Sequence, residues 1–147
     1  MPNKNNVSTG NAGEYFAAGE IERHGFTVAV PMSNVQDFDI LAINRESNKQ
    51  IAVQVKTTGR KQKIWTLSKK SEKLAGKNII YIFVSLNDLA TPEYHIVPSS
   101  IVAETIKHDR QEWLHAKGKR GQEHNDNNIR KFSDCEDIYL NRWDYLN

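Results

Sequence analysis

Two short stretches rich in β-branched residues carry polar side chains that could do chemistry. The stretches run from Ile40 to Ile43 and from Ile51 to Val55, with turn-forming residues between them, which is the pattern of a β-hairpin. Successive side chains of a strand point to opposite faces. One face of the predicted hairpin therefore carries two acids, an amide and a base, at Asp37, Asp39, Gln54 and Lys56.

The pairing of the two strands decides which of these side chains meet. If Asn44 opposes Ile51, Asp39 faces Lys56 across the hairpin. One interpretation is a cross-strand ion pair on a half-solvated sheet, worth about 0.2 to 1 kcal/mol. The flanking residues, however, are apolar enough for a strand buried on both faces. The alternative is a functional site, where a carboxylate, a second polar ligand and a lysine converge at the open end of the hairpin.

The order of these residues resembles a known nuclease motif. Phe38-Asp39 followed by Gln54-Val55-Lys56 resembles the PD-(D/E)XK nuclease superfamily, and the strand Ile51 to Thr57 is similar to that of archaeal-type Holliday-junction resolvases. Phe38 stands where the motif has proline. Gln54 stands where it has a second acid, a replacement that the superfamily tolerates. The resemblance covers roughly residues 10 to 100.

The resemblance implies metal-dependent hydrolysis of DNA phosphodiester bonds. Asp39 and the main-chain carbonyl of Val55 would bind Mg²⁺, for which Mn²⁺ can substitute, and Glu14 and Gln54 would bind it directly or through water. Lys56 would orient or activate the attacking water and neutralise developing negative charge. Asp37 remains a competing ligand, because it shares a face with Asp39.

Glu14 lies on a helix that we predict from about residue 12 to residue 24. Asn11 is a plausible N-cap for this helix, and Gly25 supplies a stop. Glu14 follows Asn11 by the spacing of a capping box, so one interpretation is a capping glutamate. The resemblance offers another, because a glutamate on the first helix of that superfamily reaches toward the metal site.

Positive charge is concentrated in the middle of the chain. The segment from Lys56 to Lys77 has a local charge of +7, although the whole chain carries only +2. This asymmetry predicts a basic face that binds a polyanion, with a solvated charge run as the alternative. Trp65 could stack on an unpaired base or belong to the core. The residues predicted to contact nucleic acid are Arg60, Lys61, Lys63, Trp65, Lys69, Lys70 and Lys73.

Length and composition indicate one domain. The chain has 147 residues, of which 38% are hydrophobic and 26% charged, as in an ordinary globular domain. Its single cysteine, Cys135, excludes an intrachain disulfide, and the five histidines show no close metal-ligand pair. We interpret these histidines as structural or surface residues. The sequence lacks a long apolar run and a signal peptide, so we expect a cytoplasmic protein without membrane contact.

The predicted fold is an α/β restriction-endonuclease-like core, with a mixed sheet of about five strands flanked by helices. Ile79 to Leu86 should form a central strand, and a helix from about 99 to 115 should bury Val102, Ile106 and Trp113. Residues 1–10 are expected to be flexible. Residues 117–128 are expected to be a flexible loop or a second phosphate-contacting loop. Apolar residues from Ile138 to Leu146 should fasten the C-terminus to the domain.

Three functions of different class remain open from the sequence. The first is a DNA endonuclease of repair, recombination or defence, for which a homodimer is suggested because two chains with one site each cut both strands most easily. The second is a nucleic-acid-binding module of the same fold that has lost catalysis, which the glutamine at position 54 motivates. The third is a protein-interaction or immunity domain whose basic face binds an acidic partner.

Overall fold

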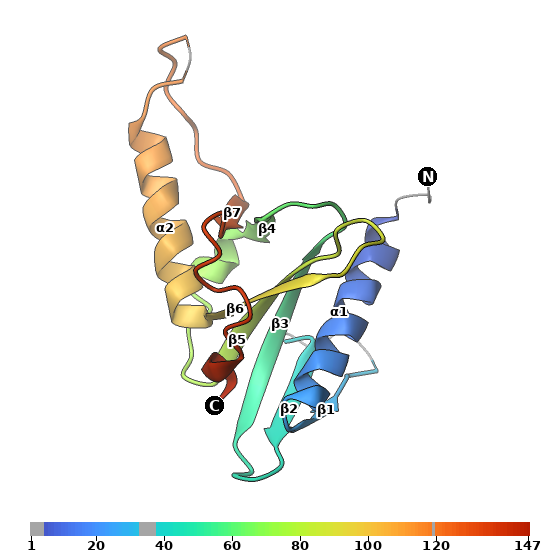
Figure 1. Ribbon diagram of the computed structural model, residues 1–147. Coiled ribbons are helices and arrows are strands. Elements are labelled where there is room, and N and C mark those ends of the chain that lie inside the picture. Colours follow the sequence, from blue (N-terminus) through green and yellow to red (C-terminus); the bar gives the residue numbers. More distant parts are fainter. Residues whose placement is uncertain (1–4, 33–37, 119) are drawn as a thin grey trace.

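The structure is a computed structural model that describes residues 5–32, 38–118 and 120–147. Two long helices flank a central sheet, and a small second sheet lies beside it (Figure 1). In chain order the elements are α1 (Asn6–Arg23), β1 (Phe26–Ala29), β2 (Ile40–Asn44), β3 (Gln50–Thr58), β4 (Ile64–Ser68), the 3-10 helix η1 (Lys69–Glu72), β5 (Ile79–Ser85), β6 (Glu93–Pro98), α2 (Ser99–His115), β7 (Ile129–Ser133) and the 3-10 helix η2 (Trp143–Leu146).

The central sheet is mixed. Its five strands lie in the order β1-β2-β3-β5-β6, and only β3 and β5 run parallel. Parallel neighbours need a crossover connection, and β4 with η1 supplies it between β3 and β5. β4 pairs with β7 in the small sheet. The predicted α/β fold with a mixed five-stranded sheet is confirmed. None of the helices in the described residues could span a membrane.

The two faces of the sheet are buried by different elements. Ile80, Ile82 and Val84 of β5 pack into a core that includes Ile21 of α1, whereas Tyr81 and Phe83 of the same strand pack into a second core. The second core includes residues of β4, β7 and α2. Burial on both faces explains the continuous apolar run of β5. β5 is the buried central strand that the sequence predicts.

Helix α1 begins earlier than the sequence pattern predicts. The side-chain oxygen of Asn5 accepts hydrogen bonds from the N–H groups of Val7 (2.9 Å) and Ser8 (3.4 Å), so Asn5 is the N-cap. The predicted start near residue 12 is wrong, because residues 6–10 belong to the helix; residues 1–4 lie outside the described chain. Glu14 is consequently in the middle of the helix, and the interpretation of a capping glutamate is excluded.

The hairpin of β2 and β3 has a different pairing from the predicted one. Ala42, not Asn44, is the partner of Ile51. The prediction is wrong by two residues because the turn between the two strands is tighter than assumed. The side-chain oxygen of Asn44 accepts hydrogen bonds from the N–H groups of Glu46 and Ser47, and Asn48 adopts a positive φ of 60°. A shift of two residues keeps every side chain on its predicted face. Gln54 and Lys56 therefore share the predicted face of β3.

Two further predictions are corrected in the C-terminal half. Val102 and Ile106 of α2 are buried, but the side chain of Trp113 is 39% exposed and stacks on His124. The C-terminal anchoring is confirmed for Leu146, which is fully buried. Ile138 does not contribute to it, because it is 57% exposed.

Gly13 lets α1 approach β3. A Cβ atom at this position would lie 2.6 Å from Cγ2 and 2.7 Å from Cβ of Thr57, whereas a Cβ at Gly19 of the same helix would meet nothing within 4 Å. Contacts below 3.0 Å force one of the two elements to move. The absence of a side chain at Gly13 therefore sets the distance between the helix and the strand.

We expect Gly13→Ala to lower the free energy of unfolding by about 1 to 3 kcal/mol, because the added methyl group overpacks the contact with Thr57. Gly19→Ala is the matched control and should raise it by about 0.5 to 1 kcal/mol, because alanine has the higher helix propensity. Urea denaturation of both variants measures the difference. Equal effects of the two substitutions would contradict the close approach.

Candidate functional site

Asp39 lies immediately before β2 and is bound to β3 by two hydrogen bonds. Its backbone N–H donates to the carbonyl oxygen of Val53 (2.8 Å), and its Oδ2 accepts from the backbone N–H of Val55 (2.8 Å). The carboxylate thus takes the place of a backbone partner at the end of the β2–β3 ladder. Oδ2 is thus held, and Oδ1 makes no hydrogen bond within the part of the chain that the structure describes.

The carbonyl of Val55 is directed to the same side. Along a strand, the backbone groups of successive residues point alternately to the two neighbouring strands. Val53 and Val55 both make hydrogen bonds on the β2 side, whereas Ala52 donates to Asn78 on the β5 side. The Val55 carbonyl therefore lies on the side of Asp39, as a shared metal site requires.

Gln54 and Lys56 project from the face of β3 that is opposite to Val53 and Val55. Both are partly buried, and their partners on β5 are Tyr81 and Phe83. The observed pairing ends with Ile40 opposite Val53, and Asp39 lies just outside the ladder. The register from which the direct opposition of Asp39 and Lys56 was predicted is thus wrong by two residues. Asp37, the competing ligand, lies outside the described residues.

Glu14 reaches this end of the sheet from α1. It is partly buried next to Gly13, at the point where the helix approaches Thr57 of β3. The pKa of Glu14 is raised above its ordinary value, first by burial and second by the negative charge of Asp39. The negative charges of the two carboxylates therefore act on each other at this end of the sheet.

The donor atoms of the predicted site residues suit a hard divalent cation. They are the carboxylates of Asp39 and Glu14, the carbonyl of Val55 and the side-chain amide of Gln54, and oxygen ligands of this kind are preferred by Mg²⁺. A cation would also relieve the repulsion between the two carboxylates that raises the pKa of Glu14. The residues therefore fit the expected ion.

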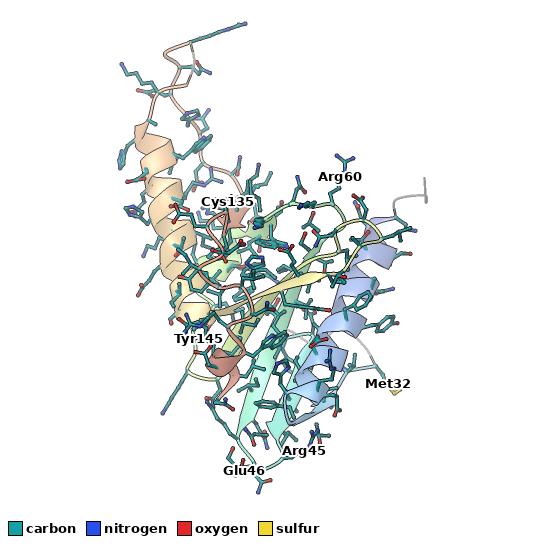
Figure 2. All side chains as sticks on the ribbon, viewed as in Figure 1. Met32, Arg45, Glu46, Arg60, Cys135 and Tyr145 are labelled. Carbon is teal, nitrogen blue, oxygen red and sulfur yellow. The ribbon has the colours of Figure 1, made fainter. Side chains whose placement is uncertain are left out.

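The basic segment from Lys56 to Lys77 does not form one face. Arg60 and Lys61 directly follow β3, whereas Lys77 directly precedes β5. Because β3 and β5 are parallel, these residues lie at opposite ends of the sheet. Figure 2 shows Arg60 far from the hairpin turn that carries Arg45 and Glu46. Only Arg60 and Lys61 extend the end of β3 that carries Lys56, and the prediction of a single basic face is wrong.

Three residues predicted to contact nucleic acid are engaged within the protein. Trp65 is 2% exposed and its Nε1 donates to the carbonyl of Val84 (2.9 Å), so the core interpretation is right and the stacking interpretation is wrong. The ammonium group of Lys63 lies 2.6 Å from a carboxylate oxygen of Asp137, and that of Lys69 lies 3.5 Å from Asp126. Lys70 and Lys73 are not fully buried and lie at η1 and directly after it.

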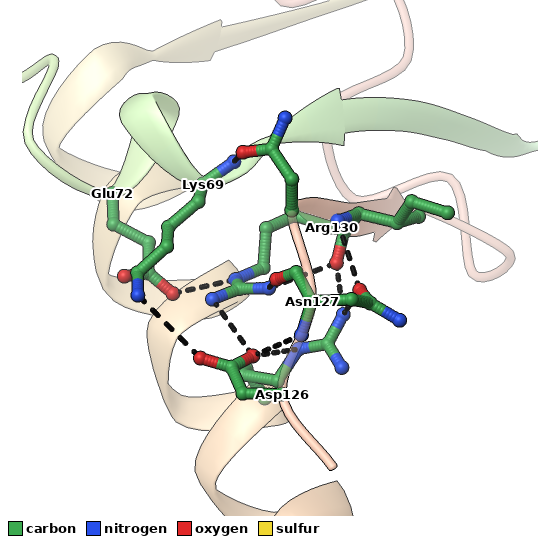
Figure 3. A network of polar contacts seen from close by, with 8 residues as sticks. Lys69, Glu72, Asp126, Asn127 and Arg130 are labelled. Carbon is green, nitrogen blue, oxygen red and sulfur yellow. Dashed lines mark hydrogen bonds and ion pairs between the residues drawn. The ribbon is translucent and has the colours of Figure 1, made fainter.

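A polar network holds η1 against β7 (Figure 3). The buried guanidinium of Arg130 lies 2.6 Å from Glu72 and 3.3 Å from Asp126. Burial acts to raise the pKa of Asp126, but the Asn127 backbone N–H and the charges of Arg130 and Lys69 outweigh it, and the pKa lies below its ordinary value. The end of the segment 117–128 is thus fastened to the domain, and its Asp126 offsets the charge of Lys69.

Sequence reasoning missed a second group of polar residues. His95 is fully buried and its Nδ1 lies 2.7 Å from Asp134, and a ring nitrogen of His95 lies within 4.8 Å of carboxylate oxygens of Glu93 and Asp137. The alternation of Glu93 and His95 on one strand was a usable signal. Asp134 and Asp137 gave none, because they follow β7, which the sequence did not predict.

Comparison with known proteins supports the fold. No protein-family model matches the sequence, and no curated protein is similar to it. The structure resembles that of a bacterial homing endonuclease, with a TM-score of 0.58 and 10% sequence identity over 97% of this chain and 92% of that chain. It also matches the Archaeoglobus fulgidus Holliday junction resolvase Hjc, with a TM-score of 0.49 and 16% identity over 88% of this chain and 86% of that chain.

The likeness to the homing endonuclease, together with the mixed five-stranded sheet and its flanking helices, confirms the predicted restriction-endonuclease-like fold. Identity is too low for the likeness to establish more than the fold. The activity therefore has to be argued from the residues of the site.

We expect Glu14→Gln to raise the melting temperature at pH 7 by on the order of 1 to 2 °C. A carboxyl group whose pKa is raised on folding does not affect stability at a pH below its ordinary pKa, and destabilises the protein as the pH rises through the raised pKa. The neutral amide removes this effect. Thermal melts from pH 4 to pH 8 measure it, with the exposed Glu104→Gln of α2 as control. A Glu14→Gln variant that is less stable than the wild type at pH 7 would contradict the repulsion.

Proposed function

We propose that the protein is a metal-dependent endonuclease that hydrolyses DNA phosphodiester bonds in repair, recombination or defence. The observation that carries this proposal is the fixed carboxylate of Asp39. It is held by the Val55 N–H, its charge raises the pKa of Glu14, and it lies at the end of the β2–β3 hairpin toward which β3 carries Lys56. The restriction-endonuclease-like fold supports the same function.

Each residue of the site has a separate task in this proposal. Asp39, Glu14 and the Val55 carbonyl would hold Mg²⁺, or Mn²⁺ in its place, and the bound cation would supply Lewis acidity toward the phosphate. The hydrogen bond from Val55 keeps Asp39 in one orientation, which preorganises the site. Lys56 would orient the attacking water and neutralise the charge that develops on the phosphate.

Gln54 defines the second candidate function. Its amide oxygen is neutral, whereas an acid at this position would bring a negative charge to the cation. A site with less negative charge binds Mg²⁺ more weakly. The alternative is therefore a nucleic-acid-binding module of the same fold without catalysis. The third candidate, a protein-interaction or immunity domain, is less well supported because the basic segment forms no single face.

The nucleic-acid surface of the proposal is centred on the end of β3. Arg60 and Lys61 are exposed and continue from the strand that carries Lys56, so they would bind the phosphates next to the site. Lys70 and Lys73, at η1 and directly after it, would bind more distant phosphates. The proposal also includes a homodimer, because one site cuts one strand and two chains would cut both. It places this dimer in the cytoplasm.

We expect Asp39→Asn and Lys56→Ala each to reduce Mg²⁺-dependent cleavage of DNA by at least about a hundredfold. Asparagine keeps an oxygen that accepts from the Val55 N–H, so Asp39→Asn removes the charge and retains the contact that fixes the side chain. Lys77→Ala is the control, because Lys77 is exposed at the other end of the sheet. Cleavage of duplex, branched and single-stranded DNA is followed on gels.

The outcome separates the candidate functions. Full activity of Asp39→Asn or Lys56→Ala would overturn the assigned site. If the wild type binds DNA but does not cleave it, and Gln54→Glu introduces cleavage, the protein is the binding module. If neither protein cleaves or binds DNA, the interaction domain is the better proposal.

We expect Arg60→Ala combined with Lys61→Ala to lower the slope of log Kd against log salt concentration by about 1.8, because each duplex phosphate contact contributes roughly 0.9. Lys77→Ala should leave the slope unchanged. Fluorescence anisotropy with a labelled duplex at several salt concentrations measures all three proteins. An equal effect of Lys77→Ala would show that binding is not centred on this end of β3.

A further inference from the structure

His95 of β6 is a buried titratable group that the proposed nuclease site does not use. Its side chain is 0% exposed, and its Nδ1 lies 2.7 Å from Oδ2 of Asp134. Asp134 is itself buried, and its carboxylate accepts the backbone N–H groups of Ile138 (2.8 Å) and Tyr139 (2.9 Å). A carboxylate that already accepts two N–H groups accepts a third from the imidazole. Asp134 therefore fixes the proton of His95 on Nδ1.

The other ring nitrogen is left as a lone-pair donor. Nε2 of His95 is buried and has no hydrogen-bond partner among the described residues. Buried polar atoms without a partner are rare in native proteins and point to a missing ligand, such as an ion or water. A histidine whose Nδ1–H is held by a carboxylate while Nε2 is free has the arrangement that metal-binding histidines adopt.

Two carboxylates surround this histidine. Glu93 lies two residues earlier on β6, and Asp137 follows β7; a ring nitrogen of His95 and one oxygen of each carboxylate all lie within 4.8 Å of one another. An ion bound to all three, with ligand distances of about 2.0 to 2.2 Å, requires only a small inward movement of the two acidic side chains. Neither side chain is fully buried, and the movement would exchange the ion pair of Asp137 with Lys63 for the bound ion.

A cationic group already lies against this cluster. The ammonium of Lys63 lies 2.6 Å and 2.7 Å from the two carboxylate oxygens of Asp137. This hydrogen bond is the main cause that raises the pKa of Lys63, and the charges of Glu93 and Asp134 add to the effect. A pocket lined by Lys63, Glu93 and Cys135, among others, opens on the side of the cluster where Glu93 and Lys63 lie; Cys135 is labelled in Figure 2.

We propose that Glu93, His95 and Asp137 form a Zn²⁺ site. In the metal-free protein, the ammonium group of Lys63 neutralises Asp137 in place of the ion. One imidazole and two carboxylates are ligands that Zn²⁺ accepts, with water in the fourth position. The site is distinct from the one at Asp39, because β6 and β2 are separated by β3 and β5 in the sheet. The bound ion would fasten the segment after β7 to β6.

The test is a calorimetric titration of the metal-free full chain with ZnCl₂, in the presence of excess Mg²⁺ and in a buffer that does not chelate metals. One ion per chain is expected. Glu93→Gln and Asp137→Asn should each weaken binding by at least about tenfold, and the exposed Glu136→Gln should leave it unchanged. Lys63→Gln should bind Zn²⁺ more tightly than the wild type, because the competing ammonium is gone.

Melting curves without zinc show whether each variant is folded. Zinc binding that survives the Glu93→Gln/Asp137→Asn double variant, or a wild type that binds no zinc, would overturn the proposal and leave the Lys63–Asp137 ion pair as the full account of the cluster. Asp39→Asn should bind zinc as the wild type does, so the result does not depend on the proposed nuclease activity.

Discussion

The hydrogen bond from the Val55 N–H to the Asp39 carboxylate determines the rest of the site. Backbone pairing between β2 and β3 ends at Asp39, and the side chain continues it by one more contact. This contact holds the acid beside the strand that carries Gln54 and Lys56, without using a flexible loop to position it. The ligand oxygen of Val55 and the carboxylate of Asp39 are therefore arranged by sheet geometry, which is among the most rigid arrangements that a protein offers.

The approach of α1 to β3 completes the site and makes it less stable. Gly13 allows the helix to come close to Thr57, and this closeness brings Glu14 into the electrostatic field of Asp39. The fold would be more stable without the second acid. Two carboxylates in a partly buried place are understandable if a cation binds between them. The negative charge that destabilises the metal-free protein would then attract the cation.

Much of this arrangement could be predicted from the sequence, because side-chain alternation in strands depends only on local order. The common face of Gln54 and Lys56 was predicted correctly although the pairing of Asn44 was wrong, since a shift of two residues leaves each strand side chain on its face. What could not be predicted depends on contacts distant in sequence. β7 pairs with β4, from which it is separated by β5, β6 and α2; this pairing sets Phe132 opposite Trp65, and Asp137 after β7 pairs with Lys63.

The two candidate metal sites differ in a way that would keep their ions apart. The site at Asp39 offers oxygen donors alone, which suit Mg²⁺, whereas the cluster on β6 offers the imidazole of His95, which favours Zn²⁺. β5 lies between the strands of the two sites and is buried on both faces. The chemistry of the donors, rather than the fold, would then decide which cation each of the two sites binds.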